Sequence, residues 1–489
     1  MSHNQNKKFI NSSSDSSSHE RIRTTGQRHQ LSRRGLLRGI AATGGLMGAE
    51  ALIGAGNIGG WGPMTQLALA QNAPEGAVRD RYYIFCYFSG GWDILVGLDP
   101  RDPGTFSDER LRSTLIQPGY DRLAGVGRNI IYTPDGTMFG PHIGEMLRHW
   151  DRLAVVRGMS METLTHEAGR RRFITGRPPS GLQARGSSGT AWLAAHLGAE
   201  EPIPNLSVRV ESFNVDQPTY SSALMVSTTD DLLRTLTPST PTLPSMVGRQ
   251  IDASLTDASN CDVAQRSAFW RAAEESRQKA LQMTQGNLAD RFNFARPEFA
   301  ELRSMYGINN TRDSVELRGA LAVQAICSGM SRCVSVAVAG GLDTHFDNWE
   351  TDQGANQERG FNVVARMVDD LAAREYKNTG RSWLDHTTIV GFSEFSRTPL
   401  LNANGGRDHA LTNACFLIGG GVRGGQVIGA SSDVGMQPMA TDLNTGRAVT
   451  QPEAGEVILP EHVLQTLFHE VGIPERRADL RVDPIRVLI

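Results

Sequence analysis

The sequence has few cysteines and none of the paired spacings that mark a thiol-based site. Its five cysteines, in a chain of 489 residues, form no Cys-x-x-Cys pair. This argues against a zinc ribbon and against a thioredoxin-like redox site. Four of the five lie in or beside apolar runs, namely Cys86, Cys327, Cys333 and Cys415. We therefore expect buried free thiols, and one disulfide remains an alternative.

The chain also lacks internal repeats of roughly 20 to 50 residues and any long apolar run after its first 70 residues. A repeat architecture and a membrane span in the mature chain are therefore not expected. A surplus of positive charge is missing as well. The formal charge is −3, and it becomes −8 when the first 70 residues, with eight Lys/Arg and three Asp/Glu, are set aside. This balance argues against a nucleic acid or an anionic membrane as the partner.

The first 70 residues have the pattern of an export signal. About 30 polar residues, expected to be disordered, precede a Ser-Arg-Arg-Gly-Leu-Leu sequence at 32–37. A glycine-diluted apolar stretch at 36–61 follows, and small residues end it at Ala70. This order is typical of a twin-arginine signal peptide, whereas the glycines disfavour the alternative of an uncleaved anchor helix. We predict recognition by the twin-arginine export machinery, cleavage near Ala70, and a periplasmic or secreted mature chain at 71–489.

Three apolar runs of strand length, 82–88, 334–338 and 387–392, are each followed at once by glycine or polar residues. In an α/β sheet the side chains that follow parallel strands meet at one edge. Carboxylate and imidazole groups without thiolate suit zinc, manganese, magnesium or calcium. The sequence therefore predicts a divalent metal site. With two residues from the loop after the last strand, its predicted ligands are Asp93, Asp343, His345, Glu394, Asp408 and His409.

Each of these residues also has an ordinary structural interpretation. The loop after residue 392 can be a surface loop with common ion pairs, and Asp93 can cap the segment that follows it. A single Asp-x-His, as at Asp343 and His345, is frequent by chance, but its recurrence after several strands favours the metal site. Arg397 can hold an oxyanion with two hydrogen bonds, or it can form a structural salt bridge.

A fourth run, at 153–156, leads to Thr163, Thr165 and His166 at the start of a predicted helix through residue 173. The exposed N–H groups of a helix start favour a bound anion, so we predict catalytic roles for Thr165 and His166, together with Arg397. The threonines can equally be N-caps. Ser160 lies in Gly-x-Ser-x-Glu, which lacks the second glycine of a nucleophile elbow, and a serine hydrolase is therefore disfavoured.

The remaining segments add structure rather than chemistry. Residues 202–305 show no clean strand alternation, and we interpret them as an insertion or cap with helix at 263–295. Strand 413–418 precedes Gly-x-Gly-x-x-Gly, but 426–429 reads as extended, so a turn between strands is favoured over a dinucleotide site. Helices are predicted at 317–329, 356–374 and 460–471. The two histidines of the last helix are interpreted as surface or packing residues.

The motifs around these positions resemble an exported bacterial family, domain-of-unknown-function family 1501 of the alkaline phosphatase and sulfatase superfamily. They are Gly-Gly-Trp-Asp, Gly-Gly-Leu-Asp-Thr-His, Phe-Ser-Glu-Phe-Ser-Arg-Thr-Pro and Gly-Arg-Asp-His, and the resemblance runs from about residue 80 to the end. It implies an α/β fold with a doubly wound, mostly parallel sheet of alkaline phosphatase/sulfatase-like type and a helical insertion. By this resemblance one ion would use Asp93 and another Asp343 with His345. Glu394 would replace an aspartate ligand, and His409 would complete the set.

Two departures from the superfamily pattern narrow the expected chemistry. The Cys-x-Pro-x-Arg signature is absent, which argues against a modified-cysteine sulfatase. Phe395 stands where many relatives have a second metal ligand, so a second ion is expected to be weak or absent. The resemblance implies an exported, metal-dependent hydrolase of a small-molecule or polymeric phosphate or sulfate ester. The alternative is a non-catalytic envelope or binding protein that keeps the fold.

Overall fold

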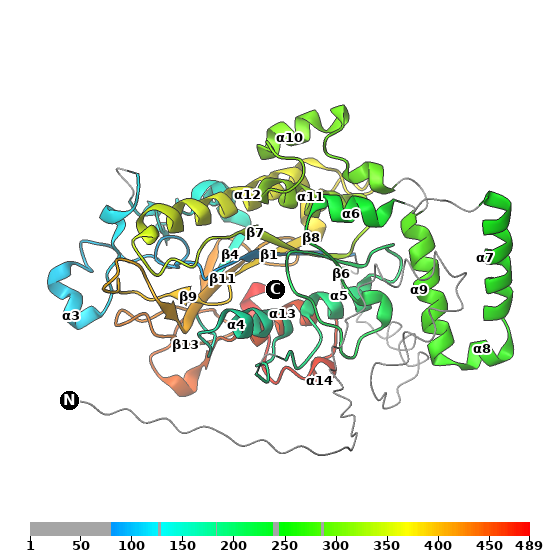
Figure 1. Cartoon of the computed structure of the whole chain (residues 1–489). Helices are drawn as coiled ribbons and strands as arrows, with labels where there is room; N and C mark the ends of the chain where they lie inside the picture. The colour runs from blue at the N-terminus through cyan, green and yellow to red at the C-terminus, as the bar shows by residue number, and fades with distance from the viewer. Residues whose placement is uncertain (1–79, 126–128, 182, 238–243, 285–287) are drawn as a thin grey trace, which may run out of the picture.

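The computed structural model describes residues 80–489 except 126–128, 182, 238–243 and 285–287. The predicted signal peptide and its cleavage site at Ala70 lie outside the described residues. At the centre is an eight-stranded sheet in the order β12-β4-β11-β8-β1-β7-β5-β6 (Figure 1). Its strands are β1 (Tyr82–Phe88), β4 (Leu153–Ser160), β5 (Asn205–Val208), β6 (Leu224–Val226), β7 (Cys333–Ala339), β8 (Thr387–Phe392), β11 (Thr412–Gly419) and β12 (Gln426–Ile428).

The sheet is mostly parallel. β1 pairs in parallel with β7 and β8, β5 pairs in parallel with β7 and β6, and β12 pairs in parallel with β4. β11 is antiparallel to both of its neighbours, β8 and β4. Parallel neighbours require crossover connections, and the non-sequential strand order shows them on both sides of β1. The predicted doubly wound, mostly parallel sheet is confirmed.

Helices cover both faces of the sheet (Figure 1). α11 (Val315–Cys327) and α12 (Gly354–Ala373) pack on one face, while α4 (His166–Thr175), α5 (Gly189–Leu197) and α13 (Pro460–Glu470) pack on the other. Alternate residues of β1 enter different cores: Ile84 and Phe88 join the first face, and Phe85 joins the second. Burial on both faces explains the unbroken apolar run, since each fully buried large side chain contributes about 1.5–3 kcal/mol.

The range 202–305 contributes both to the sheet and to a separate helical part. β5 and β6 fall inside this range and extend the sheet beyond β7. α7 (Ser245–Ser259), α8 (Asp262–Arg266) and α9 (Ala268–Thr284) stand beside the sheet at the right of Figure 1. The range 202–305, predicted as an insertion or cap, therefore contains two strands of the sheet as well as the helices after Val226. The other α-helices are α3 (Leu111–Thr114), α6 (Thr229–Leu236), α10 (Ala300–Tyr306) and α14 (Glu475–Ala478).

Short elements complete the fold around the sheet. Three two-stranded pairs are β2 (Ile131–Tyr132) with β3 (Met138–Phe139), β9 (Ser396–Arg397) with β10 (His409–Ala410), and β13 (Ala440–Thr441) with β14 (Glu456–Val457). The glycines after β11 form a turn that leads into β12, as predicted, and Gly419 and Gly421 take the positive φ values of 107° and 80° that favour glycine.

Two further findings concern the thiols and the helices. All five cysteines lie in the described residues and are free, which confirms the predicted free thiols; Cys86, Cys333 and Cys415 are buried, whereas Cys261 is exposed. A search of the described helices for a segment that is both long and apolar enough to cross a membrane finds none.

Candidate metal centre

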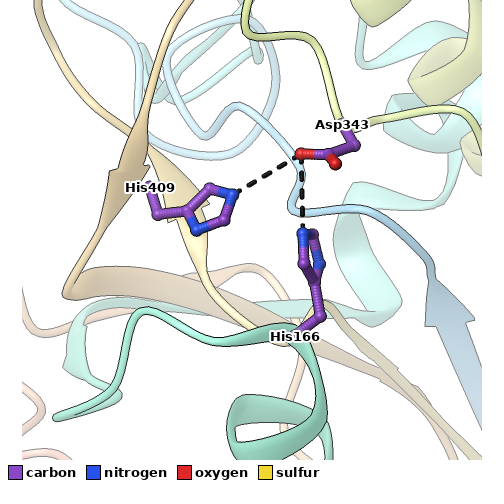
Figure 2. A group of neighbouring side chains, drawn as sticks. All are labelled: His166, Asp343 and His409. Atoms are coloured by element: carbon purple, nitrogen blue, oxygen red, sulfur yellow. Dashed lines mark hydrogen bonds and ion pairs between the residues drawn. The ribbon is translucent and has the colours of Figure 1, made fainter. Parts of the chain in front are cut away.

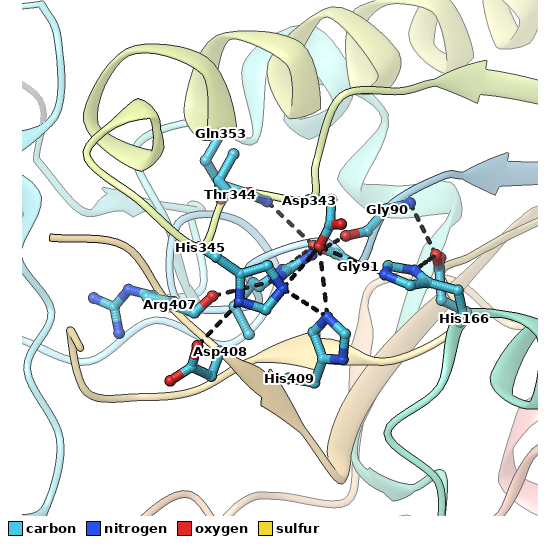
Figure 3. A network of polar contacts seen from close by, with 12 residues as sticks. Gly90, Gly91, His166, Asp343, Thr344, His345, Gln353, Arg407, Asp408 and His409 are labelled. Atoms are coloured by element: carbon cyan, nitrogen blue, oxygen red, sulfur yellow. Dashed lines mark hydrogen bonds and ion pairs between the residues drawn. The ribbon is translucent and has the colours of Figure 1, made fainter. Parts of the chain in front are cut away.

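The predicted polar side chains gather where β1, β7 and β8 end (Figure 3). The loop after β7 carries Asp343 and His345, and the residues directly after β8 bring Glu394. His166 is the first residue of α4, and the antiparallel pair β9–β10 sets His409 opposite Arg397. Segments that are far apart along the chain thus supply one cluster, as the strand-end pattern predicted.

The carboxylate of Asp343 is the centre of this cluster. Its Oδ1 atom lies 3.0 Å from His345 Nε2 and 3.5 Å from the Nε2 atoms of both His166 and His409. Figure 2 shows His166 and His409 approaching Asp343 from two different elements. These three residues offer ligand atoms that all lie within 4.8 Å of one another. His166, Asp343 and His409 thus form a group that could hold a metal ion, and His345 Nε2 lies against Asp343 and His409 beside it.

The three imidazoles are oriented through their Nδ1 atoms. His166 Nδ1 lies 2.7 Å from Glu394 Oε1, and His345 Nδ1 lies 3.0 Å from Asp408 Oδ1. His409 Nδ1 lies 2.7 Å from the backbone oxygen of Leu164. Carboxylates and carbonyls only accept hydrogen bonds, so each Nδ1 carries the proton. In the neutral rings every Nε2 then presents a lone pair, and such outer partners are the usual support of metal-binding histidines.

These lone pairs face one another. The Nε2 atoms of His345 and His409 are 2.9 Å apart, and both point toward Asp343 Oδ1. Arg397 Nη1 lies 3.2 Å from His345 Nε2, so the positive charge of Arg397 balances part of the repulsion between these lone pairs. Tetrahedral ligands at about 2.0–2.1 Å from zinc are about 3.3 Å from one another, so separations of 2.9–3.5 Å fit a small divalent ion. The residues present therefore fit the implied metal.

Arg397 supplies the fixed positive charge of the cluster through its contact with Asp343. It is fully buried, and its Nη2 lies 2.6 Å from Asp343 Oδ1. Its other donors reach the backbone oxygens of Gly90, Gly91 and Arg407 and the Nε2 of His345. All five N–H groups are thus engaged within the protein. The sequence hypothesis of a bidentate oxyanion clamp does not match this geometry, which makes Arg397 a positioning residue for Asp343.

Glu394 is buried beneath His166. Its Oε1 accepts from the Gly90 backbone N–H at 2.9 Å and contacts His166, while its Oε2 accepts from the Ser393 hydroxyl at 2.9 Å. Gly90 has a φ of 111°, and an added Cβ would lie 2.8 Å from the Asp343 backbone nitrogen. Only glycine allows this close approach without strain. Glu394 therefore orients His166 instead of joining the convergent set.

The charges of the cluster shift its pKa values. Burial alone raises the pKa of Asp343, but the hydrogen bond and charge of Arg397 and the nearby imidazoles lower it to about 2. Burial likewise opposes ionisation of Glu394, yet the hydrogen bond with His166 leaves its pKa below the ordinary value. The same hydrogen bond raises the pKa of His166, whereas burial lowers that of His409. The two carboxylates are therefore ionised at neutral pH and favour a bound cation.

Phe395 closes one side of the cluster. Its ring is fully buried and lies 4.1 Å from the ring of His409 and 4.7 Å from that of His166, measured between centroids. The benzyl side chain offers no ligand atom at the position where a second ion was expected to be weak or absent.

Two predicted site residues lie apart from the convergent atoms. Asp93 is fully buried; its Oδ1 accepts from the Leu95 backbone N–H, and its Oδ2 meets Trp349 and Arg407. The geometry thus gives Asp93 a structural ion pair in place of the predicted metal contact. Thr165 is exposed just before α4, and its hydroxyl lies 3.5 Å from that of Thr163.

Several residues that hold the cluster together were not singled out from the sequence. Arg407 belongs to the same Gly-Arg-Asp-His motif as His409, so a signal was present. The Ser393 hydroxyl contacts Glu394, and the Leu164 backbone oxygen contacts His409. No sequence pattern predicts these contacts, because serines and backbone oxygens are present in every segment of a protein. Gly90 belongs to the Gly-Gly-Trp-Asp motif, and its backbone closely approaches Glu394 and the loop after β7.

The fold and the cluster describe an α/β protein with a doubly wound sheet and a candidate metal site of carboxylate and imidazole groups at its strand ends. The chain belongs to the family described as "Protein of unknown function (DUF1501)", whose model matches residues 81–447, and the family prediction is confirmed. No curated protein matches the chain.

Some solved structures resemble the chain distantly. Ps i-CgsB, solved in complex with k-i-k-neocarrahexaose, is 10% identical with a TM-score of 0.36, over 82% of this chain and 75% of that one. The lipoteichoic acid synthase LtaP from Listeria monocytogenes is 8% identical with a TM-score of 0.33, over 85% and 79%. A Bacteroides thetaiotaomicron protein of glycosaminoglycan metabolism, BT33494S-sulf, is 10% identical with a TM-score of 0.29, over 83% and 75%. Family membership rests on the sequence match alone.

Proposed function

We propose that this protein is an exported, metal-dependent hydrolase of phosphate or sulfate esters. One observation carries the proposal: the Nε2 atoms of His345 and His409 converge on Asp343 Oδ1 while each Nδ1 is held by an acceptor. This is how proteins prepare imidazoles for a metal ion. The nitrogen-rich ligand set favours zinc over manganese, magnesium or calcium.

The ion would be held by His166, Asp343 and His409, whose ligand atoms lie within 4.8 Å of one another, with His345 as a further ligand or proton carrier. When bound, such an ion supplies Lewis-acid polarisation of an ester oxygen and activation of water. Arg397 fixes the Asp343 carboxylate, and Glu394 fixes His166 with its proton on Nδ1. The nucleophile is proposed to be water or the exposed hydroxyl of Thr165, which lies one residue before His166.

The test begins with metal content. Elemental mass spectrometry should find about one equivalent of a divalent metal in the purified mature protein. The variants His345→Ala and His409→Ala should each lose most of this metal. His469→Ala is the matched control, because His469 is an exposed histidine near the end of α13. The loaded protein should then hydrolyse p-nitrophenyl phosphate or sulfate. Unchanged metal content in both site variants ends the proposal.

The second candidate function is a non-catalytic binding protein of the cell envelope. The specific observation in its favour is Phe395, whose buried ring occupies the side of the cluster where a second ion would assist hydrolysis. This candidate predicts metal binding without turnover. A panel of phosphate and sulfate esters that stays intact with the metal-loaded protein supports it over the hydrolase.

A further inference from the structure

Exposed apolar side chains lie close along the chain to the histidines of the candidate metal centre. Fifteen large apolar side chains are exposed in the described part of the chain, and three of them lie within two positions of a cluster histidine. Leu164 is 44% exposed, Phe346 61% and Leu411 46%. Single exposed apolar residues need no explanation, but several on the segments that carry one polar cluster are typical of a ligand-binding surface.

Hydrogen bonds to the backbone bring together the two segments that carry Leu164 and Leu411. The Leu411 backbone oxygen accepts from the Met161 N–H at 2.8 Å, and the Leu164 backbone oxygen accepts from His409 Nδ1 at 2.7 Å. The segment 161–164 therefore runs along the segment 409–411. Leu411 is two residues from His409, at the bend between β10 and β11. Its exposed side chain therefore belongs to the segment that carries this histidine.

Phe346 lies at another border of the same centre. It directly follows His345, and it forms an isolated bridge with Gly405 in the loop that also carries Asp408. Glycine is required close by, because a Cβ on Gly406 would lie 2.2 Å from the His345 backbone carbon. The ring of Phe346 is thus anchored through its backbone at a rigid position while most of its surface faces solvent.

We propose that these three residues bind the apolar part of the substrate, and that the substrate is an ester of phosphate or sulfate with an alkyl alcohol. This inference rests on the proposed function, because the cluster must hold the anionic group. The charged headgroup would face the cluster of Asp343 and the histidines, while the chain would lie over Leu164, Leu411 and Phe346. Burying these exposed side chains against an alkyl chain supplies the affinity that a headgroup alone lacks.

The test uses non-hydrolysable alkylphosphonates, whose binding is measured by calorimetry on the metal-loaded, full-length mature protein. Methyl-, butyl- and octylphosphonate keep one headgroup and differ only in chain length. A fully buried methylene improves affinity about fourfold. We therefore expect octylphosphonate to bind at least about tenfold more tightly than methylphosphonate, which corresponds to partial burial of the chain.

Three variants assign the effect to the named residues. Leu164→Ser, Phe346→Ser and Leu411→Ser should each lower the ratio of octyl to methyl affinity by about threefold or more. A change that merely disturbs the metal would weaken both ligands and leave this ratio intact. Val263→Ser is the matched control, since Val263 is 79% exposed on α8, at the opposite end of the molecule in Figure 1. It should keep the wild-type ratio.

The outcomes separate this inference from the proposed function. Equal affinity for all chain lengths, or no binding of any phosphonate, overturns the inference. Hydrolysis of simple esters without chain-length dependence overturns it as well but leaves the proposed function standing. Chain-length-dependent binding without hydrolysis of any alkyl or aryl ester supports an apolar ligand surface and ends the hydrolase proposal.

Discussion

Asp93 and Arg407 form a fully buried ion pair in which Asp93 Oδ2 lies 3.0 Å from Arg407 Nε. Trp349 donates to the same oxygen at 2.9 Å, and its ring lies beside the Arg407 guanidinium. The Arg407 backbone oxygen in turn accepts from Arg397, which holds Asp343. The pair therefore stabilises the position of Arg397 and, through it, of Asp343. The side chains of Asp93 and Arg407 are not among the convergent atoms of the candidate metal centre.

Breaking this pair should destabilise the fold strongly. Arg407→Leu leaves the Asp93 carboxylate buried without its cation, and we expect a loss of about 3–5 kcal/mol in the free energy of unfolding, measured with urea. The double variant Asp93→Asn with Arg407→Leu should lose less, because no uncompensated charge remains. Arg234→Ala is the control, since its pair with Asp231 is on the surface and is worth about 0.5 kcal/mol. Wild-type stability of the single variant would contradict the structural role.

Glu394 was predicted from the sequence as a ligand, and it should matter for metal affinity through its contact with His166. Glu394→Gln replaces an obligatory acceptor for His166 Nδ1 with an amide that can also donate, so the imidazole is no longer fixed. We expect metal affinity to fall about 10- to 100-fold, measured by competition with a chromogenic chelator. Glu453→Gln changes an exposed glutamate in the same way and should have no effect. Equal affinities in the two variants would separate His166 from the metal centre.

The thiols should differ sharply in reactivity. Burial raises the pKa of Cys86, Cys333 and Cys415 far above the ordinary value, and it raises that of Cys327 to about 12. Thiolate is the reactive form, so Cys261, which is exposed, should react alone with a disulfide reagent in the folded protein. We expect about one fast thiol per chain and about five after unfolding. Cys261→Ser should abolish the fast phase.

Asp80 should make the stability of the fold depend on acidic pH. Burial raises its pKa, but hydrogen bonds from Tyr376, Arg332 and Lys377 outweigh this and lower the pKa well below the ordinary value. A lowered folded pKa means that ionised Asp80 stabilises the protein above the unfolded value of about 4, and that this contribution is lost as the pH falls below it.

Asp80→Asn should therefore cost up to about 1 kcal/mol at pH 7 and progressively less toward pH 3, measured by urea unfolding at each pH. The figure is kept low because the Asp80 side chain is 39% exposed and partly screened. Asp121→Asn serves as the comparison for an exposed aspartate. The same pH profile for both variants would remove the assigned role of the Asp80 contacts.

The sequence predicted the sheet best where both faces of a strand are buried. The run 387–392 coincides with β8, and 82–88 coincides with β1, because double burial demands unbroken apolar and β-branched residues. β5 and β6 were not recognised in 202–305. They are four and three residues long, and β5 contains Asn205 and Ser207, so neither run stands out from a loop.

For the candidate site, the strand-end rule located a region but not the role of each side chain. Asp343 and Asp93 follow strands in the same way, yet only Asp343 faces the histidines. What decides between them is the buried partner Trp349, 256 residues from Asp93 along the chain. The same holds for Arg397, whose five donors are engaged by backbone and side chains that only the fold brings near. The roles of Asp93, Asp343 and Arg397 therefore depend on buried contacts between residues far apart in the sequence, which local sequence patterns do not encode.

The position of β1 at the middle of the sheet has a consequence during synthesis on the ribosome. Ile84 of β1 lies between Val334 of β7 and Ile389 of β8. Until the nascent polypeptide has extended past β8, this wholly apolar strand has two open edges that can pair with other chains. Premature termination upstream of β8 would thus yield fragments that are prone to aggregate. A chaperone that shields β1 as it emerges from the ribosome would raise the yield of intact protein.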